Sequence, residues 1–335
     1  MAETVQTDQL DNSDVVQRRT NWLRELTQHP AVSLTAILLL MWIILSRLSP
    51  YFFSLDNVLQ ITLQAAVVAM IAAGETFVIL SGGIDLSVGS IFAMSAMTAG
   101  LVMQAKMPIP IVLAVGLLTG AVCGLANGWG VSKLQLPPFI VTLGTMSILR
   151  GFALLINKGI PIFGANPDFA FLGQGRVFDL IPVPSLVVLG VYILCWFILR
   201  QTPFGRFTYA VGSNPEAARL AGVGMSRQII SIYVLCGVLA GLAGMTEASR
   251  LSSAQPAGGV GLELDAIGAV VIGGTSLFGG EGNIVATLIG ALMIATIRNG
   301  LNIVGIEAFW QNVVTGFIII LAVYLDRLRR LHGAA

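Results

Sequence analysis

Apolar runs of about 20 residues recur along almost the whole of this 335-residue chain. Hydrophobic residues make up 56% of the sequence and charged residues only 10%, whereas a soluble domain carries about 25% charged residues. A run of this length is what an α-helix needs to cross the hydrocarbon core of a bilayer. The pattern therefore predicts an all-α, polytopic membrane protein.

About ten runs are long enough to form transmembrane helices. They cover residues 31–48, 58–80, 90–105, 109–130, 137–157, 181–200, 228–249, 264–280, 284–304 and 309–326. With ten spans, both chain ends lie on the same side of the membrane. Lys and Arg residues are more frequent in the loops on that side than in the loops on the other. Because cytoplasmic loops carry an excess of positive charge, the N- and C-termini are both predicted to be cytoplasmic.

The chain accordingly divides into a transmembrane domain over residues 31–327 and two short ends. Residues 1–30 are predicted to form a cytoplasmic N-terminal tail, and residues 328–335 a cytoplasmic C-terminal tail. The longest predicted external segment, 157–180, is too polar to span the membrane and too apolar to be a free linker. It is predicted to pack as a cap on the helix bundle, to serve as a platform for an external partner, or both.

A charged, helix-forming segment interrupts the apolar sequence on the predicted cytoplasmic side, in the loop 201–227. It has an N-cap residue, proline at the first helical position, an acidic first turn, alanines that extend a helix and a glycine that ends it. These residues, with the neighbouring arginine, are Asn214, Pro215, Glu216, Ala217, Ala218, Arg219 and Gly222. A helix of two turns at most cannot cross a bilayer. The segment is therefore predicted to be a docking element for a soluble partner.

Two glycine-rich segments, 81–89 and 273–282, stand at the ends of predicted spans and share a Gly-Gly pair, then a small polar residue and Leu, then Gly. A weaker similarity links the dipeptides Asn127-Gly128 and Asn299-Gly300. Together these similarities predict two related halves, 57–157 and 228–326. Many transporters place Gly-interrupted helices at corresponding positions of two halves. The candidate residues for a translocation path are Gly82, Gly83, Asp85, Ser87, Gly89, Asn127, Gly273, Gly274 and Asn299. The alternative is that both segments are ordinary cytoplasmic turns.

Charged residues also lie in or beside several predicted spans. They are Glu75, Asp85, Arg150, Glu247, Glu281 and Arg298. A charge at membrane depth is costly, so each is expected to face the bundle interior or an interface and to have a partner there. Structural pairing is a commoner reason for such residues than contact with a substrate. Uncharged polar residues in the spans, such as Thr62, Gln64 and Thr142, favour a path for a neutral, hydroxyl-rich solute.

Several other function classes lack their sequence patterns here. Cys123, Cys195 and Cys236 fall inside apolar runs, which indicates buried residues rather than a disulfide set or a metal site. No Gly-x-x-x-x-Gly-Lys-Ser/Thr loop is present, so the chain is not predicted to hydrolyse ATP itself. Basic residues are spread among loops, which argues against nucleic-acid binding. No catalytic residue, metal or cofactor is predicted.

Three motifs, in their order along the chain, resemble the inner-membrane permease subunit of bacterial monosaccharide ABC importers of the ribose, xylose and galactose type. They are Gly82-Gly-Ile-Asp-Leu-Ser-Val-Gly89, Gly212-Ser-Asn-Pro-Glu-Ala-Ala-Arg-Leu-Ala-Gly222 and Gly273-Gly-Thr-Ser-Leu-Phe-Gly-Gly-Glu-Gly282. The resemblance covers roughly residues 40–327. It implies a multi-pass protein of the bacterial inner membrane that translocates a ribose-like pentose or a hexose and is not itself an enzyme.

The resemblance also implies partners. In such importers two permease subunits form the pore, here either two copies of this chain or this chain and a close paralogue. A cytoplasmic ABC ATPase, expected to have duplicated domains, dimerises beneath them, and a periplasmic sugar-binding protein delivers the sugar. Glu216, Ala217, Ala218 and Gly222 match the family's loop that couples to the ATPase. Closure of the ATPase would push that helix and tilt the two spans that it joins.

Two other transport classes remain open. An ion-coupled secondary transporter would use Glu75 or Asp85 as the coupling carboxylate, and a passive channel would need no energy source. Within the same architecture, a nucleoside or a branched-chain amino acid is an alternative solute. The sequence leaves the solute open, because specificity in these importers is expected to lie mainly in the binding protein.

Overall fold

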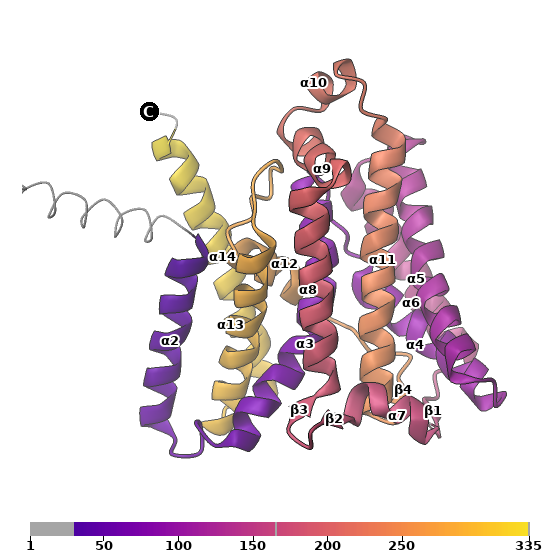
Figure 1. Ribbon diagram of the computed structural model, residues 1–335, viewed down its shortest axis with the longest axis vertical. Helices are drawn as coiled ribbons and strands as arrows, with labels where there is room; N and C mark the ends of the chain where they lie inside the picture. The colour runs from indigo at the N-terminus through magenta and orange to yellow at the C-terminus, as the bar shows by residue number, and fades with distance from the viewer. Residues whose placement is uncertain (1–29, 165, 334–335) are drawn as a thin grey trace, which may run out of the picture.

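The computed structural model describes residues 30–164 and 166–333, and most of this chain is helical (Figure 1). Within the described part, seven helices are long and apolar enough to cross a membrane. They are α2 (Pro30–Leu48), α3 (Leu55–Leu80), α5 (Ile109–Ser132), α6 (Pro138–Ile156), α8 (Val183–Gln201), α11 (Met225–Arg250) and α13 (Ile284–Ile303). The prediction of an all-α, polytopic membrane protein is confirmed. Most of the predicted N-terminal tail, residues 1–29, lies outside the described residues.

Three further helices correspond to the remaining predicted spans. α4 (Val88–Gln104) has 17 residues, α12 (Leu262–Ile272) has 11, and α14 (Ala308–Gly333) has 26 and continues into the predicted C-terminal tail. At about 1.5 Å per residue, α12 is roughly 17 Å long, little more than half of the hydrocarbon core. The predicted span 264–280 is therefore wrong in its extent, and a total of ten complete spans stays a prediction.

Two glycines explain why α12 ends early. Gly274 has a φ of +79°, a left-handed conformation that glycine adopts without steric cost. A Cβ atom on Gly273 would lie 2.7 Å from the backbone nitrogen of Thr287, so only a glycine lets the chain pass this close to α13. The chain therefore turns into the non-helical connection 273–283.

Short elements cover the two ends of the bundle. One end carries α9 (Pro203–Ser213) and α10 (Pro215–Leu220), and the other carries α7 (Pro167–Gln174) and the strands (Figure 1). The strands pair antiparallel, β1 (Ile162–Phe163) with β4 (Ser253–Ala254) and β2 (Arg176–Val177) with β3 (Ile181–Pro182). We refer to these two ends of the bundle as the α10 end and the α7 end.

The predicted external cap packs against the end of α11. The backbone N–H of Gly173 donates to Ser249 Oγ at 2.7 Å, and Ser249 Oγ donates to the carbonyl oxygen of Phe169 at 2.6 Å. Phe169 and Ser249 are both buried. Segment 157–180 is therefore anchored to the bundle through α7, and its docking of an external partner stays a prediction.

α3 and α11 form the centre of the bundle. The second half of α3 is buried throughout, and α11 packs against α3, α4 and α5. A Cβ atom on Gly120 would overlap the carbonyl oxygen of Gly237, and a Cβ atom on Gly237 would overlap that of Gly120. These glycines lie in small-xxx-small spacings, which let the backbones of two membrane helices approach closely.

The two halves of the chain repeat one order of elements in opposite directions. α3 ends beside α9 and is followed by a break and the short helix α4, whereas α11 begins at the α10 end, finishes against α7 and is followed by a break and α12 (Figure 1). The breaks contain Gly82-Gly-Ile-Asp-Leu86 and Gly258-Gly-Val-Gly-Leu262. The sequence predicted two related halves but paired the first break with 273–282. The order of elements pairs it with 258–262.

Candidate functional site

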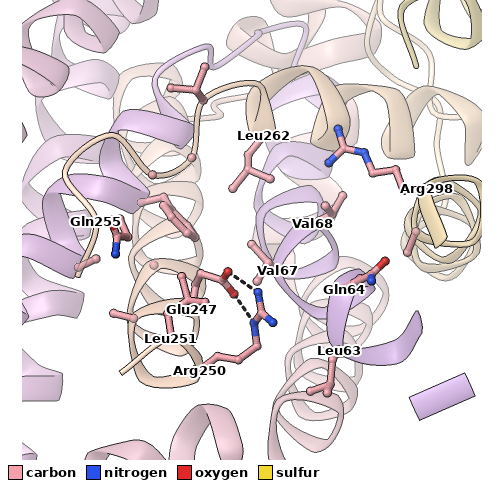
Figure 2. A pocket seen from close by; sticks show the side chains of 18 of the residues that line it. Leu63, Gln64, Val67, Val68, Glu247, Arg250, Leu251, Gln255, Leu262 and Arg298 are labelled. Carbon is pink, nitrogen blue, oxygen red and sulfur yellow. Dashed lines mark hydrogen bonds and ion pairs between the residues drawn. The ribbon is translucent and has the colours of Figure 1, made fainter. Parts of the chain in front are cut away.

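A cavity of about 380 Å³ lies among α3, α4, α11, α13 and the connection between β4 and α12 (Figure 2). Its wall includes apolar side chains, such as Val67, Phe92 and Leu262. Polar residues join them, namely Gln64, Glu247, Arg250, Ser253, Gln255, Arg298, Asn302 and Gln311. An apolar wall with a small number of placed polar groups is the usual composition of a site for a small solute.

Glu247 and Arg250 form an ion pair on the cavity wall, one turn apart near the end of α11 (Figure 2). The Arg250 guanidinium donates from Nε and Nη2 to the two carboxylate oxygens of Glu247 at 2.8 and 2.6 Å. Such two-point pairs fix both side chains in one geometry. The two charges compensate each other on the wall itself.

A second ion pair links α13 to α12. Arg298 Nη2 lies 2.6 Å from Asp265 Oδ2, and the Asp265 side chain is only 2% exposed. The Nε atom of Arg298 is buried and has no hydrogen-bond partner among the residues that the structure describes. The charge of this cavity-lining arginine is thus compensated, while one of its donors remains unused.

Two amide side chains add uncharged polar groups to the wall. Gln64 is half-buried on α3 and makes no hydrogen bond to the described part of the chain. Gln255 follows β4 and donates from Nε2 to Ser253 Oγ at 2.9 Å. The cavity therefore presents hydrogen-bonding groups without an unpaired charge from these residues.

The start of α4 packs closely against the connection between β4 and α12, beside the cavity. A Cβ atom on Gly89 would overlap the carbonyl oxygen of Gly259, and a Cβ atom on Gly259 would overlap that of Gly89. The Arg150 side chain donates from Nη1 to the carbonyl oxygen of Gly258 at 2.5 Å. Phe92 lines the cavity beside these glycines. Non-helical backbone at membrane depth must be buried in protein or line a water-filled cavity, so that its polar groups find partners.

The first group of predicted path residues forms a buried network outside this cavity. Ser87 donates from its backbone nitrogen and Oγ to Asp85 Oδ1 at 2.9 and 2.6 Å, and Asn127 Nδ2 donates to Ser87 Oγ at 2.7 Å. Glu75 Oε1 accepts from the backbone N–H of Asp85 at 3.0 Å. All four side chains are fully buried. The network ties the connection between α3 and α4 to α5, and a role in translocation stays a prediction.

The other predicted path residues do not line the cavity either. They are Gly82, Gly83, Gly89, Gly273, Gly274 and Asn299. The glycines form turns or close backbone contacts. Asn299 Nδ2 donates to Asn57 Oδ1 at 2.8 Å and so joins α13 to the start of α3.

Arg250 and Gln255 were not among the path residues predicted from the sequence, because neither lies in a motif or in the middle of a predicted span. One signal was available. The Gly-Gly pair at 258–259 repeats the pattern of the first break and marks the second, and both of its residues line the cavity.

The predicted docking helix is present as α10. Asn214 Oδ1 accepts the backbone N–H of Ala217 at 3.0 Å, and Pro215 occupies the first turn. Ala218 is buried against Val211 and Val223, whereas Glu216, Arg219 and the other surface residues of α10 are exposed. Gly222 follows the helix with a φ of +85°. α10 stands at one extremity of the bundle, as a docking element requires (Figure 1).

Comparisons with known proteins identify the family. Residues 57–323 match the permease component of branched-chain amino acid transport systems. A ribose import permease protein of Bacillus subtilis is 47% identical over 292 residues, which cover 87% of this chain and 90% of the relative. A D-allose transport system permease protein of Escherichia coli is 42% identical over 87% of this chain and 90% of the relative.

A probable ABC transporter permease protein of Sinorhizobium fredii is 37% identical over 85% of this chain and 86% of the relative. No solved structure matches the chain significantly. The family match covers most of the chain and ends inside α14. The chain therefore belongs to the family of permease components of branched-chain amino acid transport systems, and it is a multi-pass transport subunit of the inner membrane.

Proposed function

We propose that this chain is the membrane-spanning permease of an ABC importer for a monosaccharide, a ribose-like pentose or a hexose. Two of its relatives are named for ribose and D-allose, which are both monosaccharides, and a third is named an ABC transporter permease. The cavity beside α11 supports the same class of solute on independent grounds.

The observation that carries the proposal is the internal compensation of charge around the cavity. Glu247 is paired with Arg250, and Asp265 with Arg298. Uncharged amide groups, above all that of Gln64, remain for hydrogen bonds to a solute. A neutral, hydroxyl-rich solute can use such groups without the desolvation cost of an ion.

The same observation weighs against an amino acid, although the family description names branched-chain amino acids. A zwitterion entering this cavity would need partners for its ammonium and its carboxylate. The charged side chains there already satisfy each other, so binding a zwitterion would break an ion pair.

Ion coupling is less well supported than ATP coupling. The two carboxylates that a proton or sodium ion would use, Glu75 and Asp85, are fully buried and hydrogen-bonded away from the cavity. ATP coupling requires a separate chain, because the sequence contains no phosphate-binding loop.

The proposed complex contains further subunits. A cytoplasmic ABC ATPase with duplicated domains docks on α10, and a periplasmic sugar-binding protein docks at the α7 end. A second permease copy completes the pore, because paired ATPase domains offer two equivalent docking sites and each chain supplies one α10. In the proposed cycle, sugar enters the cavity from the α7 end, and movement at α10 opens the close contact of Gly89 with Gly259.

Uptake in proteoliposomes tests the proposal. The complex purified with its ATPase from the native membrane is supplied with the binding protein and radiolabelled ribose. We expect uptake that requires ATP, persists with an uncoupler, and is reduced by unlabelled D-allose but not by leucine or adenosine. Uptake that collapses with the uncoupler, or label displaced by leucine or adenosine alone, would overturn it.

A variant tests the cavity itself. Gln64→Leu is expected to lower the uptake of limiting ribose about fivefold, because one hydrogen bond to the sugar is worth about 1 kcal/mol. Gln201→Leu is the matched control, since Gln201 is exposed at the end of α8 and does not line the cavity. Equal losses in both variants would remove the cavity from the sugar path.

A further inference from the structure

Three backbone segments meet where α9 ends. The backbone N–H of Gly280 donates to the carbonyl oxygen of Leu80, the last residue of α3, at 2.9 Å. A Cβ atom on Gly212 would overlap that carbonyl oxygen and would lie 2.6 Å from the backbone nitrogen of Gly280. The end of α9 is therefore in direct backbone contact with α3 and with the connection 273–283.

The second glycine-rich motif supplies one side of this meeting point. Gly279 and Gly280 have φ values of +84° and +77°, and a Cβ atom on Gly280 would lie 2.8 Å from the Cα atom of Ser213. Tyr209 Oη donates to the carbonyl oxygen of Gly282 at 3.0 Å. Gly279 and Gly280 thus serve contact with the end of α9.

A third tie joins α9 to α11. Gln228 Nε2 donates to the carbonyl oxygen of Phe204 and to Thr208 Oγ1, both at 2.9 Å. Gln228 and Thr208 are both buried. α9 is thus fixed to α3, to α11 and to the connection that leads into α13.

We propose that Leu80, Gly212, Gly279 and Gly280 form a glycine joint that transmits displacement of α10 to the walls of the cavity. α10 begins two residues after Ser213, so movement of α10 acts directly on the end of α9. At the joint, backbone contacts backbone, and no side chain is present at the glycines to change rotamer and absorb the movement. Closely packed interiors of this kind transmit displacement rather than damp it.

The joint connects to the elements that carry the cavity. α3 bears Gln64, and the connection 273–283 leads into α13, which bears Arg298. Gly212, Gly279 and Gly280 are positioning residues in this account, since none of them lines the cavity. The inference rests on the proposed function for its source of movement, the ATPase.

The test uses a cysteine in the cavity as a reporter. Gln64→Cys is labelled with a maleimide in the purified complex, without nucleotide and with ATP and vanadate. The native Cys123, Cys195 and Cys236 are buried, so they give little background. We expect the labelling rate to differ between the two states, and the difference to fall about tenfold when Gly212→Ala is added.

Gly224→Ala is the matched control. Gly224 lies in the same loop, and a Cβ atom there would have no heavy atom within 4 Å. Tyr209→Phe removes one hydrogen bond at the joint and adds no bulk. It is expected to reduce the labelling difference by less than Gly212→Ala, and it replaces Gly212→Ala as the test if that variant does not fold. Co-purification of the ATPase with every variant shows that docking at α10 is retained.

Each outcome decides the inference. It is overturned if the labelling difference is absent from the parent complex, or if Gly212→Ala and Tyr209→Phe both keep it at the level of Gly224→Ala. Ribose uptake is measured on the complex of the unsubstituted chain, which keeps Gln64. A nucleotide-dependent labelling difference without ribose uptake would remove the proposed solute and leave the joint supported.

Discussion

The charged residues around the cavity form ion pairs with one another. Asp265 is almost fully buried, and an unpaired carboxylate there would cost several kcal/mol of desolvation. Arg298 compensates it from the neighbouring helix. The sequence indicated that Arg298 needs a partner, because a charge in a span is costly. It could not name Asp265, since only the packing of α12 on α13 brings the two residues together.

Removing one member of this pair has a predictable effect on stability. Arg298→Met is expected to destabilise the protein by about 3 kcal/mol, because Asp265 stays buried without a counter-charge. The double variant Arg298→Met, Asp265→Leu is expected to regain most of this loss. Thermal denaturation in detergent measures both. Equal melting temperatures for the single and double variants would contradict the role of the pair.

Whole elements differ in how far local sequence predicts them. α10 follows from an N-cap, a proline and an acidic first turn, which act within a few residues of one another. α12 ends where it does because Gly273 passes close to Thr287, which is a contact between different elements. The sequence therefore predicted α10 correctly and made α12 too long.

Two substitutions in and after α10 test its docking role. Glu216→Lys places the wrong charge at the start of an exposed helix, and Gly222→Pro cannot adopt the φ of +85° found there. Both variants are expected to accumulate normally and to lose ATP-driven ribose uptake. Glu216→Gln, which keeps the shape and removes the charge, is the control and is expected to retain more uptake. Normal uptake by both variants at matched protein levels would make α10 a mere connection.

For the whole molecule, the sequence predicted the fold class, an all-α membrane protein, but not the cavity. Long apolar runs establish the helical membrane fold, and the three ordered motifs point to the family. The matching of the first glycine-rich break with 273–282 was wrong, because short glycine-rich matches arise in more than one place. The cavity wall draws on several elements, so its composition becomes visible only once they are packed.

The orientation of the molecule in the membrane is directly testable. Leu220 in α10 is 85% exposed, and Phe178 between β2 and β3 is 91% exposed. Because the α10 end is predicted to be cytoplasmic, Phe178→Cys is expected to react with a membrane-impermeant maleimide in intact spheroplasts. Leu220→Cys is expected to react only after the membrane is opened, and the parent chain controls for its buried cysteines. The opposite pattern would reverse the topology.

The pairing of charges around the cavity has an electrical consequence. Moving one elementary charge through the membrane potential changes its energy by about 2.3 kcal/mol per 100 mV. With Glu247 balancing Arg250 and Asp265 balancing Arg298, these four side chains leave no net charge beside the solute. A neutral sugar in such surroundings experiences no force from the potential. Under the proposed function, import is therefore electrically silent, and the same chain works equally well in an energised and a de-energised membrane as long as ATP is present.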